Sequence, residues 1–182
     1  MKRTLIAVAL VMLLVAVAAQ AQAPAPKPGP EHKKLEIFVG DWTYEGEYHA
    51  TPYGPAGKCT GKQTVRPILG GHFVEFRSEE KGAAGTIQYH EIDGYDPVAK
   101  NYTWNGFDSN GCSQAVTYTF AGNTVTYSGT QIIGAKQYKI RGTIVFAPDL
   151  MSDVAKNEIS VDDQTWTPIF EGKFTKAKSS PK

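Results

Sequence analysis

Hydrophobic and polar residues alternate along most of the chain between Trp42 and Lys176. A period of two is typical of antiparallel β-strands that bury one face and expose the other to water. We therefore predict strands throughout this region, and the alternation is clearest in the segments that begin near Trp42, His72, Tyr102, Val116, Val125, Tyr138 and Trp166.

Turn signals separate these segments at intervals of about 8–12 residues, a spacing typical of all-β sandwiches and barrels. The alternation by itself allows both architectures. A single open sheet of about ten strands would expose two edges, and closure into a barrel removes them. We predict an all-β fold, an antiparallel up-and-down β-barrel of about ten strands. The turn signals are Gly70-Gly71, Lys81-Gly82, Asp96-Pro97, Ser109-Asn110-Gly111, Gly122-Asn123 and Asp162-Asp163.

One helix is expected, over residues 31–39, immediately before the first strand. Leu35, Phe38 and Val39 would share one face of it. Pro30 is a favourable first-turn residue and Gly40 a favourable terminator.

Composition narrows the class of protein. The 182 residues include 19 Lys and Arg against 18 Asp and Glu. This length fits one ordinary domain, and the balanced charge gives no general basic footprint for nucleic acid. We therefore predict no nucleic-acid partner.

Residues 1–21 have the pattern of a secretory signal peptide. Lys2 and Arg3 precede an apolar run of 15 residues, and Ala19-Gln20-Ala21 is a small-x-small cleavage site. The alternative is a membrane anchor, but a spanning helix needs about 20 apolar residues. We expect a periplasmic or secreted protein with no membrane span after cleavage.

The remaining boundaries follow from composition. Residues 22–30 contain four prolines and are expected to form an extended tether. Residues 31–176 form the barrel domain, and residues 177–182 are expected to be a disordered tail.

Cys59 and Cys112 are the two cysteines of the chain. Because an exported protein meets an oxidising compartment, we expect them to form a disulfide. Two separate buried thiols are the alternative.

The segment LEIFVGDW, residues 35–42, resembles the start of the lipocalin-like (calycin) barrels, in which a short helix leads to Gly-x-Trp on the first strand. The resemblance implies that Trp42 plugs the closed end of the barrel. The chain is also similar to secreted bacterial proteins of unknown function that are related in fold to nitrobindin. The similar stretches are GPEHKKLEIFVGDWTYEGEY, RPILGGHFVEF, GYDPVAKNY and WTPIFEGKFTK.

Nitrobindin-type proteins bind haem through a histidine late in the chain. The last histidine here is His90, so we expect no haem, and we predict no other cofactor. No spacing of the four histidines predicts a metal site. His72 shares parity with Val74 and Phe76, and would either bond to a neighbour or face a ligand.

Two groups of charged residues are interpreted as structural. The mixed run Glu75, Arg77, Glu79, Glu80 and Lys81 is expected to be a solvated strand face and turn. Asp93, Asp96 and Asp108 lie beside Gly or Pro and are interpreted as turn formers.

Aromatic residues on the apolar parity are the candidates for a ligand-binding cavity. Their alternative role is a filled core. Barrels of eight or more strands can nevertheless enclose a ligand. The candidates are Trp42, Tyr44, His72, Phe76, Tyr102, Trp104, Tyr118, Tyr127, Tyr138 and Phe170.

Three functional hypotheses follow. The first is a barrel that binds a small apolar or amphipathic molecule in its interior. The second is a filled envelope module that meets a partner through its surface. An enzyme at the barrel mouth, including haem-based chemistry, is less favoured because no catalytic motif is present. The sequence does not predict an oligomeric state.

Overall fold

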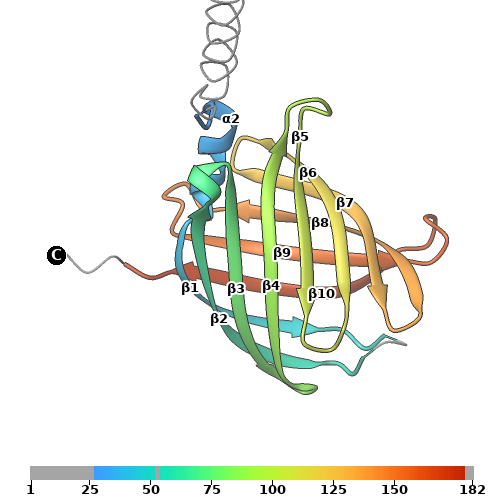
Figure 1. Ribbon diagram of the computed structural model, residues 1–182. Helices are drawn as coiled ribbons and strands as arrows, with labels where there is room; N and C mark the ends of the chain where they lie inside the picture. The colour runs from blue at the N-terminus through green and yellow to red at the C-terminus, as the bar shows by residue number, and fades with distance from the viewer. Residues whose placement is uncertain (1–26, 52–53, 179–182) are drawn as a thin grey trace, which may run out of the picture.

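The computed structural model describes residues 27–51 and 54–178. In this part of the chain ten antiparallel strands each pair with the next, and β10 pairs with β1 to close the barrel (Figure 1). The predicted up-and-down barrel is confirmed and the sandwich is excluded. The strands are β1 (Gly40–Tyr48), β2 (Gly57–Ile68), β3 (Phe73–Gly82), β4 (Gly85–Asp96), β5 (Asn101–Asp108), β6 (Ser113–Ala121), β7 (Thr124–Ile133), β8 (Lys136–Phe146), β9 (Ser152–Ser160) and β10 (Thr167–Lys176).

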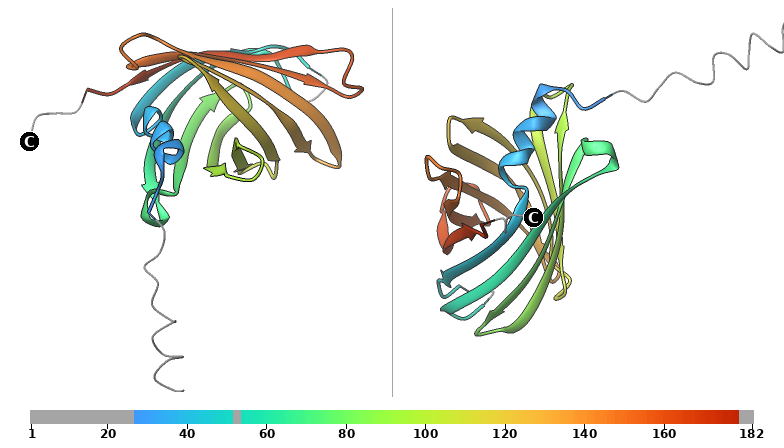
Figure 2. Two further views of the ribbon diagram at one scale, coloured as in Figure 1. Left: turned by 90° about the horizontal axis from the view of Figure 1, so that it is seen from above. Right: turned by 90° about the vertical axis from the view of Figure 1, so that its left-hand side faces the viewer.

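The alternation seen in the sequence separates an inner from an outer face. On β1, Trp42 and Tyr44 are buried, whereas Thr43 and Glu45 are exposed. The sheet curves around an interior, with the helical segment at one end (Figure 2). Apolar burial of the inner face is therefore what drives the strands to close.

The helical segment is shorter than predicted and begins one residue earlier. It consists of α2 (Pro30–Lys33), a single α-helical turn, and η1 (Lys34–Ile37), a turn of 3₁₀-helix. The strand starts at Gly40, whose φ of +148° is a conformation that side chains disfavour. The helical segment ends at Ile37, so the chain can turn from the helix into β1 over Phe38, Val39 and Gly40.

The helical segment closes one end of the barrel. Leu35 and Trp42 are 1% and 3% exposed. The Trp42 indole Nε1 donates a hydrogen bond of 2.8 Å to the Phe38 carbonyl. The Phe38 ring contacts Phe76 and Phe146, with centroids 5.5 and 5.6 Å away. Trp42 and Phe38 thus form an aromatic plug.

Two side chains attach this plug to the wall. The Tyr102 hydroxyl on β5 lies 3.0 Å from the Glu31 carbonyl and 2.9 Å from the Glu31 carboxylate. Lys176 on β10 donates a hydrogen bond of 3.0 Å to the Ile37 carbonyl and lies 4.7 Å above the Trp42 ring. The helix is therefore fixed to strands on both sides.

The expected disulfide is absent, because Cys59 and Cys112 are both free thiols. Cys59 lies on β2 and Cys112 immediately precedes β6. Four strand spacings separate these strands, roughly 20 Å around the wall, whereas a disulfide requires Cα atoms within about 7 Å of each other. An oxidising compartment allows a disulfide only where the fold brings two thiols together, and this barrel keeps Cys59 and Cys112 apart.

Some of the expected segments fall outside the described residues. These are the signal peptide at 1–21, residues 22–26 of the tether and residues 179–182 of the tail. Within the described part, Gly29 precedes α2, and the Ala177 amide donates to the Asp41 carbonyl at 2.7 Å.

Over the described residues, every helix is too short to traverse a bilayer.

Trp42→Phe tests the aromatic plug. Phenylalanine keeps an aromatic ring but leaves the Phe38 carbonyl without its buried donor, so we expect a loss of about 1–3 kcal/mol in the free energy of unfolding. Trp166→Phe is the control, because Trp166 is only half-buried and stacks with Arg141. Urea denaturation followed by circular dichroism compares the two, and equal losses would contradict the role given to the plug.

Candidate functional site

A cavity of about 390 Å³ occupies the interior between the aromatic plug and the opposite end. This volume is enough for roughly a dozen water molecules. All ten strands contribute to its lining. Residues of the β1–β2, β3–β4 and β5–β6 connections also line it, so it opens at the end away from the helix.

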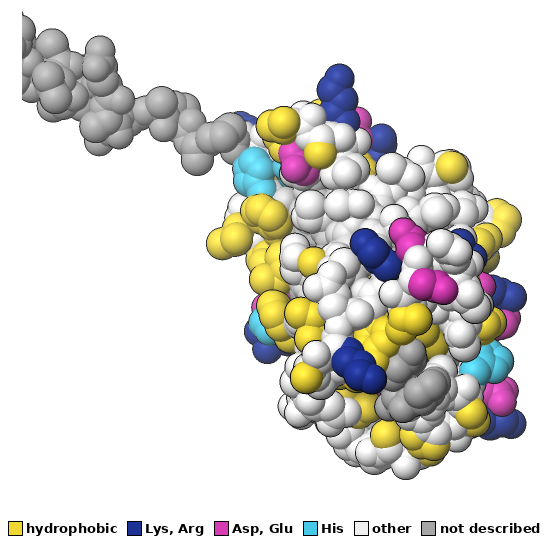
Figure 3. All heavy atoms as spheres, turned by 90° about the vertical axis from the view of Figure 1, so that its right-hand side faces the viewer, with side chains coloured by type: hydrophobic (Ala, Val, Ile, Leu, Met, Phe, Trp, Pro, Cys, Tyr) yellow, Lys and Arg dark blue, Asp and Glu magenta, His cyan; other side chains and the backbone are white. Residues whose placement is uncertain are grey.

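The residues of the strand connections that line the mouth are mostly uncharged. Phe107 lines it and is 63% exposed. Figure 3 faces the side where the β7–β8 and β9–β10 turns lie, and shows hydrophobic side chains together with several Lys or Arg and Asp or Glu side chains. This rim is compatible with entry of an apolar group.

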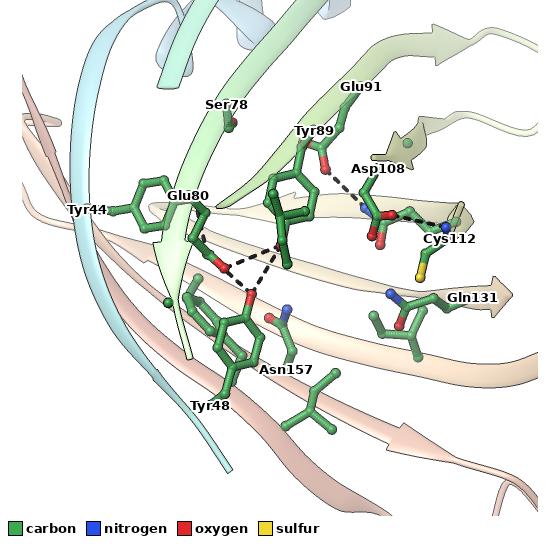
Figure 4. Close-up of a pocket in the computed structure, with 18 of the residues that line it drawn as sticks. Tyr44, Tyr48, Ser78, Glu80, Tyr89, Glu91, Asp108, Cys112, Gln131 and Asn157 are labelled. Carbon is green, nitrogen blue, oxygen red and sulfur yellow. Dashed lines mark hydrogen bonds between the residues drawn. The ribbon is translucent and has the colours of Figure 1, made fainter. Parts of the chain in front are cut away.

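A cluster of three tyrosines surrounds Glu80 on one wall of the cavity (Figure 4). Tyr44 and Tyr48 donate to Glu80 Oε2 at 3.2 and 3.3 Å, and Tyr89 donates to Oε1 at 3.4 Å. Glu80 is 3% exposed. Tyr44 fits because Gly61 on β2 has no side chain, and a Cβ there would clash with the tyrosine ring.

Burial, with Glu80 nearby, raises the pKa of Tyr44, Tyr48 and Tyr89 well above the ordinary value. These hydroxyls therefore stay protonated at neutral pH and remain donors. Their three hydrogen bonds occupy the Glu80 carboxylate.

A second polar group lies on β4, where Glu91 and Asp93 both face the cavity. Gln114 Nε2 donates to Glu91 Oε1 at 3.2 Å, and Tyr118 donates to Asp93 Oδ2 at 2.7 Å. Asp93 is 3% exposed, and its Oδ1 atom has no hydrogen-bond partner. Gly106, opposite Glu91 on β5, leaves room for the Glu91 and Gln114 side chains.

Burial controls the protonation of this pair. It raises the pKa of Glu91 to about 7 and the pKa of Asp93 well above its ordinary value. The Trp104 indole opposes the rise at Glu91, but its N–H does not reach hydrogen-bond geometry and is left without a partner. At neutral pH Glu91 is therefore partly ionised, and burial favours the neutral form of Asp93 more than in an exposed aspartate.

Other polar side chains line the rest of the cavity. The Tyr127 hydroxyl donates to Asn157 Oδ1. Gln131 Oε1 is buried without a partner. Nearer the plug, burial raises the pKa of Asp153 to about 7, and the attraction of Lys176 opposes this rise.

The two thiols are not activated. Burial raises the pKa of Cys59 to about 12 and that of Cys112 to about 11. Both therefore stay protonated at neutral pH, whereas the thiolate is the reactive form. Across the described ranges, no three His, Cys, Asp or Glu side chains are placed to hold a metal ion.

The structure separates the ten aromatic and histidine candidates into two sets. Trp42 forms part of the plug, Tyr102 attaches the plug to the wall, and Tyr138 is buried outside the cavity lining. His72 precedes β3 and stacks edge-on with His32 beside the helix, at 4.9 Å between centroids, so it also lies outside the lining. The cavity brings together the other six: Tyr44, Phe76, Trp104, Tyr118, Tyr127 and Phe170.

Two interpretations of charged residues need correction. Glu80, expected on a solvated face, is buried because it has the parity of Phe76. Asp93, expected in a turn, lies inside β4 with the parity of Tyr89. The alternation of inward and outward positions along each strand therefore identifies Glu80 and Asp93 as inward-facing residues. Glu91 has this parity too, whereas Gln131 and Asn157 carry no charge or aromatic ring that would single them out.

The closed barrel, its plugged end and its interior cavity define a lipocalin-like protein. The chain belongs to the family described as "Protein of unknown function (DUF1579)", whose model matches residues 27–176. Curated proteins yield no match to this chain.

Two solved structures share the fold. One is Rv2717c from M. tuberculosis, with a TM-score of 0.61 and 10% identity over 82% of this chain and 99% of that one. The other is the S-type phycobiliprotein lyase CPES from Guillardia theta, with a TM-score of 0.57 and 10% identity over 82% of this chain and 94% of that one. At this identity they support the architecture alone.

Glu80→Leu tests the tyrosine cluster. The substitution removes the acceptor that Tyr44, Tyr48 and Tyr89 share, so we expect a loss of about 2–4 kcal/mol in the free energy of unfolding. Glu79→Leu, on the outer face of the same strand, should change it by less than about 0.5 kcal/mol. Urea denaturation measures both, and a Glu80→Leu loss no larger than the control would contradict the cluster's role.

The raised pKa of Glu91 predicts how stability depends on pH. Between the unfolded value of 4.5 and the folded value of about 7, the folded state binds more protons, so stability falls as pH rises through this window. We expect wild type to lose about 2–3 kcal/mol more than Glu91→Gln between pH 4 and pH 8. Glu79→Gln should follow wild type. Parallel curves for wild type and Glu91→Gln would contradict the shift.

Proposed function

We propose that this protein binds a small apolar or amphipathic molecule inside its barrel. The observation that carries the proposal is the cavity of about 390 Å³. Ligand sites typically measure about 300–1,000 Å³ and combine apolar walls with a few convergent polar groups. The interior therefore favours ligand binding over a filled envelope module.

The lining favours an amphipathic ligand. Phe76, Ile140 and Phe170 supply apolar surface. Trp104 Nε1 and Gln131 Oε1 are buried there without partners. An unpaired buried polar atom costs about 1–3 kcal/mol, and a ligand that bonds to either atom would remove that cost.

The proposed place of action is the periplasm or the extracellular space. Its support is the sequence of residues 1–21, with a basic start, an apolar run and a small-x-small site. A cleaved protein would carry the whole of residues 27–176, the region that the family model matches.

N-phenyl-1-naphthylamine, a neutral dye that fluoresces in apolar surroundings, tests the proposal. We expect saturable binding with one dye per chain. Ser78→Phe should weaken it at least about tenfold, because Ser78 lines the cavity on β3 and phenylalanine would fill part of it. Fluorescence titration measures the affinity.

Glu79→Phe is the matched control, because it adds the same ring to the outer face of the same strand. Its affinity should remain within about twofold of wild type. Ser78→Leu provides a smaller filling step if Ser78→Phe fails to fold. Absence of saturable binding, or equal affinity in the inner and outer variants, would overturn the proposal.

A further inference from the structure

The charges that line the cavity are of one sign. Its lining includes five carboxyl side chains and no Lys or Arg, and its one histidine, His49, is exposed. An anionic ligand would meet no opposite charge there, and an unpaired buried charge is costly. The carboxyl residues are Glu80, Glu91, Asp93, Asp108 and Asp153.

Three of these carboxyls already have partners. Glu80 accepts from three tyrosines. Asp108 Oδ1 accepts from the backbone amides of Asn110 and Cys112, at 2.8 and 3.0 Å. Asp153 interacts with Lys176 beside the plug. Glu91 and Asp93 each accept one hydrogen bond, from Gln114 and Tyr118, on a single oxygen, so each keeps a second oxygen with capacity for a ligand.

Asp93 gives independent evidence of a missing partner. It is 97% buried, since 3% is exposed, and it lines the cavity with Oδ1 unpaired. Glu91 lies two residues away on the same face of β4, roughly 7 Å along the strand. Gln131 Oε1 is a second buried oxygen without a partner, and Trp104 Nε1 is a buried nitrogen without one. An ammonium group can donate to either oxygen.

We propose that the ligand is an organic cation, an amphipathic amine whose ammonium group binds between Glu91 and Asp93. This inference rests on the proposed function and names the ligand class. An ammonium group supplies several donors and no acceptor. Its apolar part would lie against the aromatic wall, where Trp104 and Tyr127 pack edge to face at 5.3 Å, and aromatic faces attract cations.

Binding should release protons. Burial raises the pKa of Glu91 to about 7 and also raises that of Asp93. A cation beside them favours the ionised form, so each ammonium that displaces a carboxyl proton to solvent forms an ion pair. Cation affinity should therefore rise between pH 6 and pH 8.

No positively charged side chain among the described residues interacts with Glu91, which is consistent with cation affinity that rises with pH. The titratable groups that interact with it are Asp93, Tyr89 and Tyr127. Neutral neighbours complete the site: Gln114 on β6, Trp104 and Gly106 on β5, and Phe76 opposite on β3.

Three probes of one shape test the charge preference by isothermal titration calorimetry. They are 1-naphthylmethylammonium, 1-naphthalenemethanol and 1-naphthoate. Near pH 8 we expect the ammonium to bind at least about tenfold more tightly than the alcohol, and the carboxylate to bind most weakly. Titration in buffers of different ionisation enthalpy should show proton release for the ammonium alone.

Variants locate the site. Glu91→Gln and Asp93→Asn should each weaken ammonium binding by about tenfold and leave alcohol binding within about twofold. Glu79→Gln removes the same charge from the outer wall and should change neither. Glu91→Gln carries the test if Asp93→Asn fails to fold, which circular dichroism will show.

The outcomes separate the two proposals. If the alcohol or the carboxylate binds as tightly as the ammonium, the cation preference is overturned and cavity binding stands. An ammonium affinity unchanged in Glu91→Gln would overturn the site. If no probe binds and the neutral dye also fails to bind, both proposals fall.

Discussion

The pairing of β10 with β1 determines what the interior of this protein can hold. Eight strands give a barrel that side chains can just fill, and this barrel has ten. The short helix closes one end with Phe38 and Trp42, and the rest of the interior keeps a cavity of about 390 Å³. Closure of the barrel thus has two consequences. It leaves the sheet without exposed edges, and it encloses the space in which a ligand could bind.

The polar chemistry of the cavity follows from this enclosure. Away from water, tyrosine hydroxyls keep their protons and carboxyls resist ionisation. Glu80 is stable there because three hydroxyls converge on it. Asp93 has one hydroxyl partner and one free oxygen. The difference between these two acids, one occupied and one partly free, distinguishes a structural group from one that can receive a ligand.

Parity along the strands allowed the fold and most of the aromatic lining to be predicted, because inward side chains repeat every second residue. Phe76 and Trp104 are examples. Glu80 and Asp93 were misplaced because charge was weighted above parity, although each continues an inward series. The separation of Cys59 and Cys112 depends on their positions around the closed wall, which cysteine number does not encode. Tyr138 shows that an inward position need not reach the cavity.

Native mass spectrometry of the protein purified from its own host, without denaturation, tests the central claim most directly. We expect a complex whose mass exceeds that of the chain by one small molecule, which unfolding releases as a compound with an amino group and an apolar part. A population that carries only the mass of the bare chain, under conditions that preserve non-covalent complexes, would contradict it.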